Sequence, residues 1–69
     1  RWRLNMLTER EVAILKMIAQ GMINKQIGAE LELSEKTVKH YVTNILQKLQ
    51  VRNRLEAALI AQQELKLSK

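Results

Sequence analysis

Residues 24–50 read NKQIGAELELSEKTVKHYVTNILQKLQ, and this stretch decides the fold. It predicts a short helix capped by Asn24, a tight break that ends at Ser34, and a longer helix over about residues 35–50. The longer helix is apolar on one face and polar and basic on the other. A helix of this size and amphipathic character is typical of those that enter the major groove of DNA.

The apolar side chains of the longer helix recur three and four positions apart, which places them on one face. They are Val38, Tyr41, Val42, Ile45, Leu46 and Leu49. The opposite face carries Lys36, Lys39, His40, Thr43, Asn44 and Gln47. Gly28 lies in the shorter helix, where a glycine costs about 1 kcal/mol relative to alanine. We therefore expect Gly28 at the point where the two helices touch.

Two further helices are expected, one on each side of this stretch. Thr8 followed by Glu11 is a capping box that opens an amphipathic helix, and Gly21 ends that helix. Asn53 followed by Glu56 repeats the capping pattern and opens a last helix. Four helices and no strand are expected, so the predicted fold class is all-α.

The length and composition limit the possible classes of protein. A chain of 69 residues allows a single domain over residues 1–69, with a core expected over about 7–64 and the last helix ending near Glu64. The absence of cysteine excludes disulfides and thiolate metal sites and fits a cytoplasmic location. No apolar run approaches the roughly 20 residues of a membrane span. Because the chain does not begin with Met, we expect a domain of a longer protein.

The formal net charge of +5 is concentrated in the second half of the helix-turn-helix and just beyond it. Residues 35–54 contain one acidic residue, Glu35, against the basic residues Lys36, Lys39, Lys48, Arg52 and Arg54. A localised basic stripe predicts an anionic partner. The alternative is a basic helix face that is simply solvated.

An enzyme is not expected. The sequence shows no nucleophile–base arrangement and no glycine-rich phosphate loop. His40 is the only histidine and there is no cysteine, so a metal site is not expected, and no cofactor is predicted.

Several short motifs follow one another along nearly the whole chain. They are Leu7-Thr8-Glu9-Arg10-Glu11, Ala19-Gln20-Gly21, Asn24-Lys25-Gln26-Ile27-Gly28, Leu31, Ser34-Glu35-Lys36-Thr37-Val38-Lys39, Lys48-Leu49, Val51, Arg54, Glu56 and Ala57. Over roughly residues 7–61 this pattern resembles the LuxR-type helix-turn-helix domain of NarL/FixJ response regulators and quorum-sensing regulators. The resemblance implies a four-helix bundle with a central helix-turn-helix formed by the second and third helices. It implies transcription regulation by the C-terminal output domain of a two-component response regulator. It also implies a covalently linked N-terminal receiver or ligand-binding domain.

Three positions depart from the family pattern. Ile23 stands where the family more often has Ser or Thr, so the cap of the second helix is expected to fall to Asn24. Tyr41 occupies a position that is often His, and we expect it in the core. Gln50 replaces a frequent Gly, which predicts a less sharp exit from the third helix.

The resemblance implies that the third helix reads DNA. The base-reading positions of the family fall on Lys39, His40 and Thr43, and a lysine can donate to guanine O6 and N7. Phosphate contacts are expected from Lys25, Lys36, Thr37, Asn44 and Lys48. The alternatives are a phosphate contact alone for Lys39, a local helix-capping role for Thr37, and simple solvation for His40 and Asn44.

The fourth helix carries two apolar strips, whereas a helix packed on one side needs only one. The first strip is Ala57, Ile60 and Ala61, and we expect its alanines to face the core. The second, Leu55, Ala58, Leu59 and Gln62, is the expected contact with a second copy in a homodimer on DNA. The alternative is a more deeply buried helix.

Arg54 is left out of the DNA contacts, because a structural ion pair with Glu11 or Glu9 suits it better.

Two other functions use the same fold. One is the promoter-reading domain of a sigma factor, which the extra helix from Asn53 argues against. The other is a helical adaptor that binds protein instead of DNA. Retention of DNA at low salt, with steep loss as salt rises, separates the DNA-binding functions from the adaptor.

Overall fold

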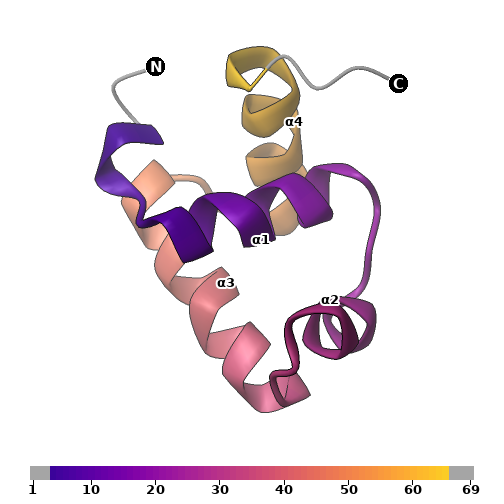
Figure 1. The fold of residues 1–69 in the computed structure, drawn as a ribbon. Helices are drawn as coiled ribbons and strands as arrows, with labels where there is room; N and C mark the ends of the chain where they lie inside the picture. The colour runs from indigo at the N-terminus through magenta and orange to yellow at the C-terminus, as the bar shows by residue number, and fades with distance from the viewer. Residues whose placement is uncertain (1–3, 66–69) are drawn as a thin grey trace.

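The computed structural model describes residues 4–65, which form one short 3₁₀-helix and four α-helices (Figure 1). In chain order these are η1 (Leu4–Met6), α1 (Glu9–Ala19), α2 (Asn24–Leu31), α3 (Glu35–Leu49) and α4 (Arg54–Glu64). This range contains no strand, so the predicted all-α class with four α-helices is confirmed. None of its helices has the length and apolar character that a membrane crossing requires.

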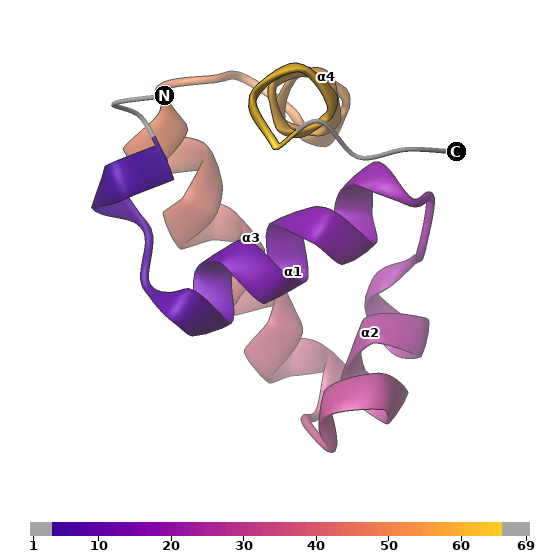
Figure 2. The same cartoon turned by 45° about the horizontal axis from the view of Figure 1, so that its top comes forward.

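The helices cross one another around α1. α1 contacts both α3 and α4, and α2 packs against α3 at the lower end of the molecule in Figure 1. In Figure 2 α4 is viewed almost end-on, and it lies across α1 from α2. α2 and the start of α3 therefore lie on the side of α1 away from α4, and α3 then runs past α1 toward α4 (Figures 1 and 2).

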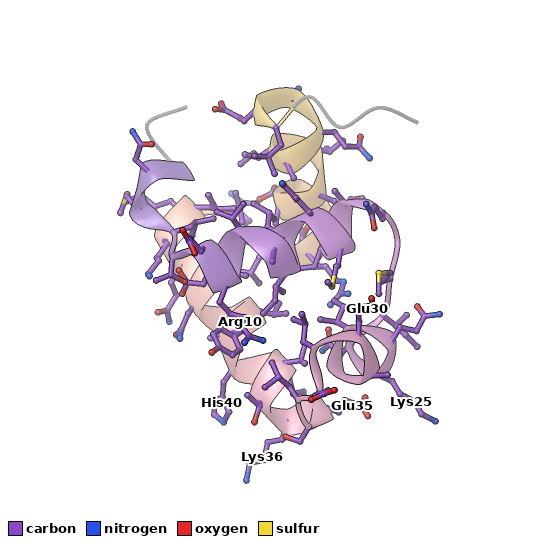
Figure 3. All side chains as sticks on the ribbon, viewed as in Figure 1. Arg10, Lys25, Glu30, Glu35, Lys36 and His40 are labelled. Atoms are coloured by element: carbon purple, nitrogen blue, oxygen red, sulfur yellow. The ribbon has the colours of Figure 1, made fainter. Side chains whose placement is uncertain are left out.

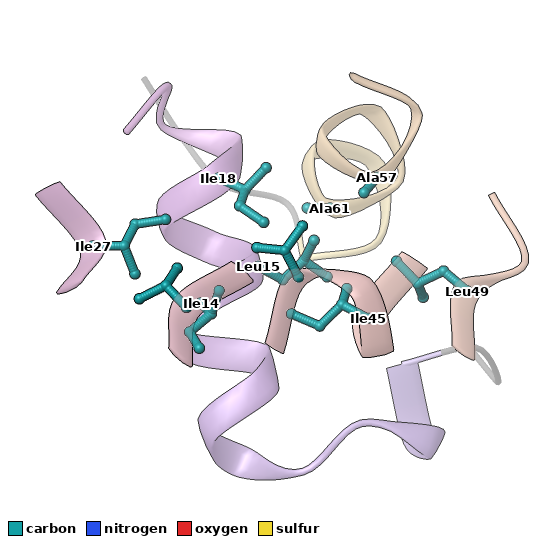
Figure 4. Close-up of a cluster of buried hydrophobic side chains, with 10 residues drawn as sticks. Ile14, Leu15, Ile18, Ile27, Ile45, Leu49, Ala57 and Ala61 are labelled. Carbon is teal, nitrogen blue, oxygen red and sulfur yellow. The ribbon is translucent and has the colours of Figure 1, made fainter. Parts of the chain in front are cut away.

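The core is a cluster of aliphatic side chains between α1, α3 and α4, with one contribution from α2 (Figure 4). Its members are Ile14, Leu15, Ile18, Ile27, Val38, Val42, Ile45, Leu49, Ala57 and Ala61. The predicted apolar face of α3 is thus confirmed for the four residues that α3 contributes. Tyr41 and Leu46 are only partly buried and pack against the edge of this cluster.

Three of the four helices begin as their sequences predict. The capping box of α1 is complete, because Thr8 Oγ1 accepts from the Glu11 N–H at 3.1 Å and Glu11 Oε1 accepts from the Thr8 N–H at 2.9 Å. Ser34 caps α3 by accepting from the amide of Thr37 at 3.0 Å. Asn53 caps α4, since its Oδ1 accepts from the amide three residues later at 2.9 Å.

The predicted cap of α2 is wrong. The capping position is Ile23, whose side chain has no hydrogen-bonding atom, and Asn24 is already the first helical residue. Only the reverse half of a capping box remains, in which Gln26 Oε1 accepts from the Ile23 N–H at 3.0 Å. Asn24 is displaced from capping because its Oδ1 accepts from Arg54 Nη1 at 2.5 Å.

Arg54 is structural, as expected, but its predicted acidic partners are wrong. Its guanidinium donates to Asn24 and to the carbonyl of Met22, and so ties the start of α4 to the loop between α1 and α2. Partial burial lowers the pKa of Arg54, which nevertheless stays charged near neutral pH.

Glu11 pairs with Lys48 instead, and this ion pair joins the first turn of α1 to the last turn of α3. Lys48 Nζ lies 2.8 Å from Glu11 Oε1, with side-chain exposures of 35% for the lysine and 6% for the glutamate. Burial by itself raises the pKa of the Glu11 carboxyl. The hydrogen bond from Lys48, the Thr8 amide and the lysine charge outweigh that effect, so the net pKa is lowered.

The exit from α3 is as sharp as a glycine would make it, contrary to expectation. Gln50 adopts φ 59° and ψ 43°, the left-handed conformation that a glycine would favour at this position. Its N–H donates to the Gln47 carbonyl at 3.1 Å, and the N–H of Val51 donates to Leu46 at 3.1 Å. At the end of α1, Gly21 is left-handed with φ 87°, which agrees with its predicted role.

Gly28 lies at a close approach between α2 and the start of α3, as predicted: the backbone of the turn is nearest to it, and Val38 of α3 lies at van der Waals distance. A Cβ atom at Gly28 would lie 2.5 Å from the Leu33 carbonyl oxygen and 3.6 Å from Val38 Cγ2. The Leu33 N–H also donates to the Gly28 carbonyl at 2.8 Å. The backbone of the turn therefore folds directly over Gly28, and no side chain fits between them.

Gly28→Val should destabilise the domain by about 1–3 kcal/mol or more, because the new side chain forces the turn away from α2. At about 4–8 °C per kcal/mol, this lowers the Tm by several degrees or more in a thermal melt without DNA. The matched control is Ala29→Val, which places the same side chain at the neighbouring exposed position of α2. A Gly28→Val Tm within about a degree of the Ala29→Val Tm would contradict the close approach.

Glu11→Gln should lower the Tm at neutral pH and remove part of the pH dependence of stability. Because the folded state lowers the pKa of Glu11, its stabilisation is complete above the ordinary glutamate pKa of about 4.3 and is lost as pH falls through the lower folded value. The Tm difference between the parent and Glu11→Gln should therefore be constant above about pH 5 and shrink below about pH 4. Glu30→Gln, at an exposed position of α2, controls for the loss of a carboxylate. A difference that does not change down to about pH 2 would show that the charge of Glu11 is not the stabilising feature.

Candidate nucleic-acid interface

The outward face of α3 gathers four polar side chains between its first turn and its middle. Lys36, Lys39, His40 and Thr43 are all exposed and together line one open hollow. In Figure 3 Lys36 and His40 project away from the body of the molecule. The three residues predicted to read bases, Lys39, His40 and Thr43, are thus brought together on one surface.

The rotation of α3 is set by its buried residues. Val38, Val42 and Ile45 are at most 8% exposed and hold the helix against α1 and α4. Because successive residues turn by about 100° in an α-helix, His40 and Thr43 must then point outward. The cap at Ser34 fixes where the helix begins, so these side chains occupy its first turns.

The residues predicted to contact phosphates differ in their exposure and in whether another residue already binds their polar atoms. Lys25 and Lys36 are exposed, and both project at the lower edge of the molecule in Figure 3. Asn44 is also exposed, in the middle of α3. Thr37 is partly buried, and its Oγ1 accepts from Ser34 Oγ at 2.9 Å, so it contributes to the cap as the alternative interpretation held.

Lys48 is not a free cation. Its ammonium is occupied by Glu11 at 2.8 Å, a pairing that sequence reasoning did not find because the two residues are 37 positions apart. To contact a phosphate, the Lys48 ammonium would have to bind Glu11 and the phosphate at the same time or release Glu11. We therefore separate Lys48 from the free lysines of the surface.

Acidic side chains lie at and beside the α2–α3 turn. Glu30 near the end of α2 and Glu35 at the start of α3 are exposed on either side of the α2–α3 turn, which itself contains exposed Glu32. Glu35 stands in the first turn of α3, where a negative charge complements the helix dipole. The positive charge is therefore strongest along the outer face of α3 and weaker at the turn.

α1 also presents a basic side chain on this side of the molecule. Arg10 is exposed and projects from α1 beside α3, on the side where His40 and Lys36 lie (Figure 3). Sequence reasoning placed Arg10 only in a family motif and gave it no role. Its proximity to α3 depends on how the two helices cross, which no local pattern encodes.

α4 buries one strip and exposes part of the other. Ala57 and Ala61 are fully buried, as predicted, whereas Leu55 and Leu59 are 69% and 51% exposed. Ala58 is partly buried and packs against the core. One residue of each strip, Ile60 of the first and Gln62 of the second, lies in a different environment from the rest of its strip. Ile60 is partly buried but lies outside the core cluster, and exposed Gln62 donates through Nε2 to the Ala19 carbonyl at 3.3 Å.

No group of three His, Cys, Asp or Glu side chains within residues 4–65 is arranged to hold a metal ion. On α3, the exposed side chains of Lys36, Lys39, His40 and Thr43 form a cluster of cations and hydrogen-bonding groups. Such a surface suits an extended anionic partner.

Comparison with known proteins places this surface in a family. Residues 5–61 match the family model described as "Bacterial regulatory proteins, luxR family". The chain is 54% identical over 55 residues to the transcriptional regulatory protein LiaR of Bacillus subtilis, covering 80% of this chain and 26% of that protein. It is 48% identical over 60 residues to the nitrate/nitrite response regulator protein NarL of Escherichia coli, covering 87% of this chain and 28% of that protein.

The chain thus spans little more than a quarter of the length of these relatives, at 26% and 28%. The family match extends over all four α-helices except the end of α4. The expectation of a DNA-binding regulatory domain, and not an enzyme, is confirmed, because the chain belongs to the luxR family of bacterial regulatory proteins.

Proposed function

We propose that this domain recognises a specific sequence of double-stranded DNA, with α3 in the major groove. The observation that carries the proposal is the exposed cluster of Lys36, Lys39, His40 and Thr43 on the outer face of a helix whose inner face is locked in the core. A rigid helix can hold such donors in register with base edges without further ordering on binding. The membership of the luxR family supports the same partner.

Within this proposal, three side chains of α3 read bases. Lys39 donates to guanine O6 or N7, and His40 and Thr43 contact the neighbouring base edges. All three are exposed; Lys39 and His40 lie in the N-terminal half of α3, the half whose residues contact base edges in helix-turn-helix proteins, and Thr43 lies near its middle.

The backbone contacts come mainly from free cations. Lys25 at the start of α2 and Lys36 at the start of α3 contact phosphates, and Asn44 adds a hydrogen bond. Thr37 can still donate its hydroxyl hydrogen to a phosphate while it accepts from Ser34. Lys48 contributes indirectly, by holding α3 against α1 through Glu11.

We further propose that two copies meet through α4 on DNA, as a homodimer. Leu55 and Leu59 supply exposed apolar area, with Ala58 and Gln62 at the edge of the contact. The area of one short helix is small compared with the roughly 1,200 Å² or more of a stable interface. DNA compensates because it holds both copies at high effective concentration.

The length of the relatives supports a larger protein around this domain. LiaR is named a transcriptional regulatory protein and NarL a nitrate/nitrite response regulator, and the chain covers 26% and 28% of them. We propose that it is the output domain of a two-component response regulator, linked to an N-terminal receiver domain.

The proposal is tested first by selecting duplexes from a random pool with this domain and sequencing those retained. We expect one enriched motif and an affinity that falls steeply as salt rises, because cations on the protein release counterions from DNA. Retention that is insensitive to salt, or no retention at all, would favour the protein-binding adaptor.

Lys36→Ala should weaken binding to every duplex by a similar factor and reduce the slope of log K against log salt by about 1. Lys48→Ala is the informative comparison, because its ammonium is already paired with Glu11. We expect Lys48→Ala to lower the Tm and leave the salt slope almost unchanged. If Lys36→Ala and Lys48→Ala reduce the salt slope equally, Lys48 contacts a phosphate after all.

Lys39→Ala should cost about 1–3 kcal/mol on the selected sequence and less on random DNA, because a base contact contributes to only one of them. Competition binding with the two duplexes measures the difference. Equal losses on both duplexes would make Lys39 a backbone contact.

Leu59→Asp should abolish cooperative binding to a duplex with two half-sites about one helical turn apart, because a charge enters the apolar contact between copies. Since Leu59 is 51% exposed in the monomer, the Tm and the affinity for a single half-site should change little. Cooperativity that survives the substitution would place the dimer contact elsewhere, and loss of folding would show that this strip is buried.

A further inference from the structure

We infer that the DNA-binding surface extends beyond the helix-turn-helix onto the first turn of α1, where Arg10 contacts a backbone phosphate. The inference rests on the proposed DNA binding and adds a third helix to the contact surface. Arg10 contributes a sequence-independent contact at the border of the groove that α3 occupies.

The first turn of α1 is held rigidly beside α3. The capping box between Thr8 and Glu11 fixes the local backbone, with both hydrogen bonds formed. The carboxylate of Glu11 then bonds to Lys48 on α3 at 2.8 Å, so this turn cannot swing away from α3 without breaking an ion pair. Arg10 is the residue next to Glu11 and shares this fixed position.

The side chain of Arg10 points along α3 and away from α4. Arg10 lies one turn before Ile14, so the two residues are on the same face of α1. Ile14 is fully buried, and in Figure 4 it lies on the side of the core nearest Ile27 of α2. Figure 3 shows the guanidinium of Arg10 extending from α1 toward the level of α3 where His40 projects.

Arg10 is available for a ligand. It is exposed, and among residues 4–65 no hydrogen bond or ion pair occupies its guanidinium. Lys48, which the sequence predicted to contact a phosphate, is already paired with Glu11. An unpaired arginine is well suited to such a contact, because its planar guanidinium can donate two parallel hydrogen bonds to one phosphate.

Arg10 and Lys25 lie on α1 and α2, the two helices that precede α3 and pack against it. Lys25 is exposed at the start of α2, and Arg10 is exposed at the start of α1. Arg10 therefore adds a cation from outside the helix-turn-helix to the phosphate contacts proposed for Lys25 and Lys36.

The test measures the affinity of Arg10→Gln and of the parent domain for the selected duplex at several salt concentrations between about 0.05 and 0.2 M. Counterion release changes the affinity strongly over this range. We expect about a three- to tenfold loss of affinity near 0.1 M salt and a salt slope smaller by about 0.9, on selected and random duplexes alike. Arg10→Lys should retain the slope. Lys16→Gln is the matched control, since it removes an exposed cation from the last turn of the same helix and should change neither quantity.

A second measurement locates the contact. Ethylation of a phosphate that Arg10 contacts should weaken binding of the parent domain and have no effect on Arg10→Gln, whether or not the variant is less stable. A parent-like slope in Arg10→Gln, an equal loss in Lys16→Gln, or identical ethylation patterns in parent and variant would overturn the inference while leaving the proposed function intact. Failure of the parent domain to bind duplex DNA in a salt-dependent way would overturn both.

Discussion

The close passage of the turn backbone over Gly28 is the constraint on which the recognition surface depends. The Leu33 carbonyl oxygen lies where a side chain at position 28 would begin, so α2 and α3 meet at a separation that only glycine permits. This separation allows Ile27 and Val38 to enter the same core. Once these two residues are buried, helical periodicity leaves no choice about which side chains of α3 face outward. The geometry of one turn thus decides the orientation of the proposed base-reading residues.

A second constraint divides the cations into structural and free ones. Lys48 is paired with Glu11, and Arg54 is bonded to Asn24 and the Met22 carbonyl. These two residues hold α3 against α1 and α4 against the loop before α2. The cations that remain exposed include Arg10, Lys25 and Lys36 in the first turns of α1, α2 and α3, and Lys39 on the outer face of α3. Net charge alone would therefore overstate the number of contacts available to DNA, and the salt slope reports the free cations instead.

The two sides of α4 differ in their residues, and the proposed assembly on DNA rests on this difference. The side of α4 that packs inward uses small residues, Ala57 and Ala61, which let it approach α1 closely. Its outer side keeps Leu55 and Leu59 exposed, an arrangement that adds no stability to the monomer. A weak apolar contact of this kind suits assembly that occurs only when DNA brings two copies together, because the domain then remains separate in the absence of its site.

The sequence by itself determined the four helices, three of their caps and the buried face of α3. These features depend on residues three or four positions apart, as at Thr8, Ser34 and Asn53, so a local pattern contains them completely. It also determined the family, because the pattern extends over nearly the whole chain. Only the tertiary structure decided that Glu11 takes Lys48, that Asn24 takes Arg54 and that Arg10 remains free beside α3. The two residues of the first pair are 37 positions apart and those of the second are 30 apart. No local pattern distinguishes these partners from other polar residues, and the angle at which the helices cross decides which of them meet.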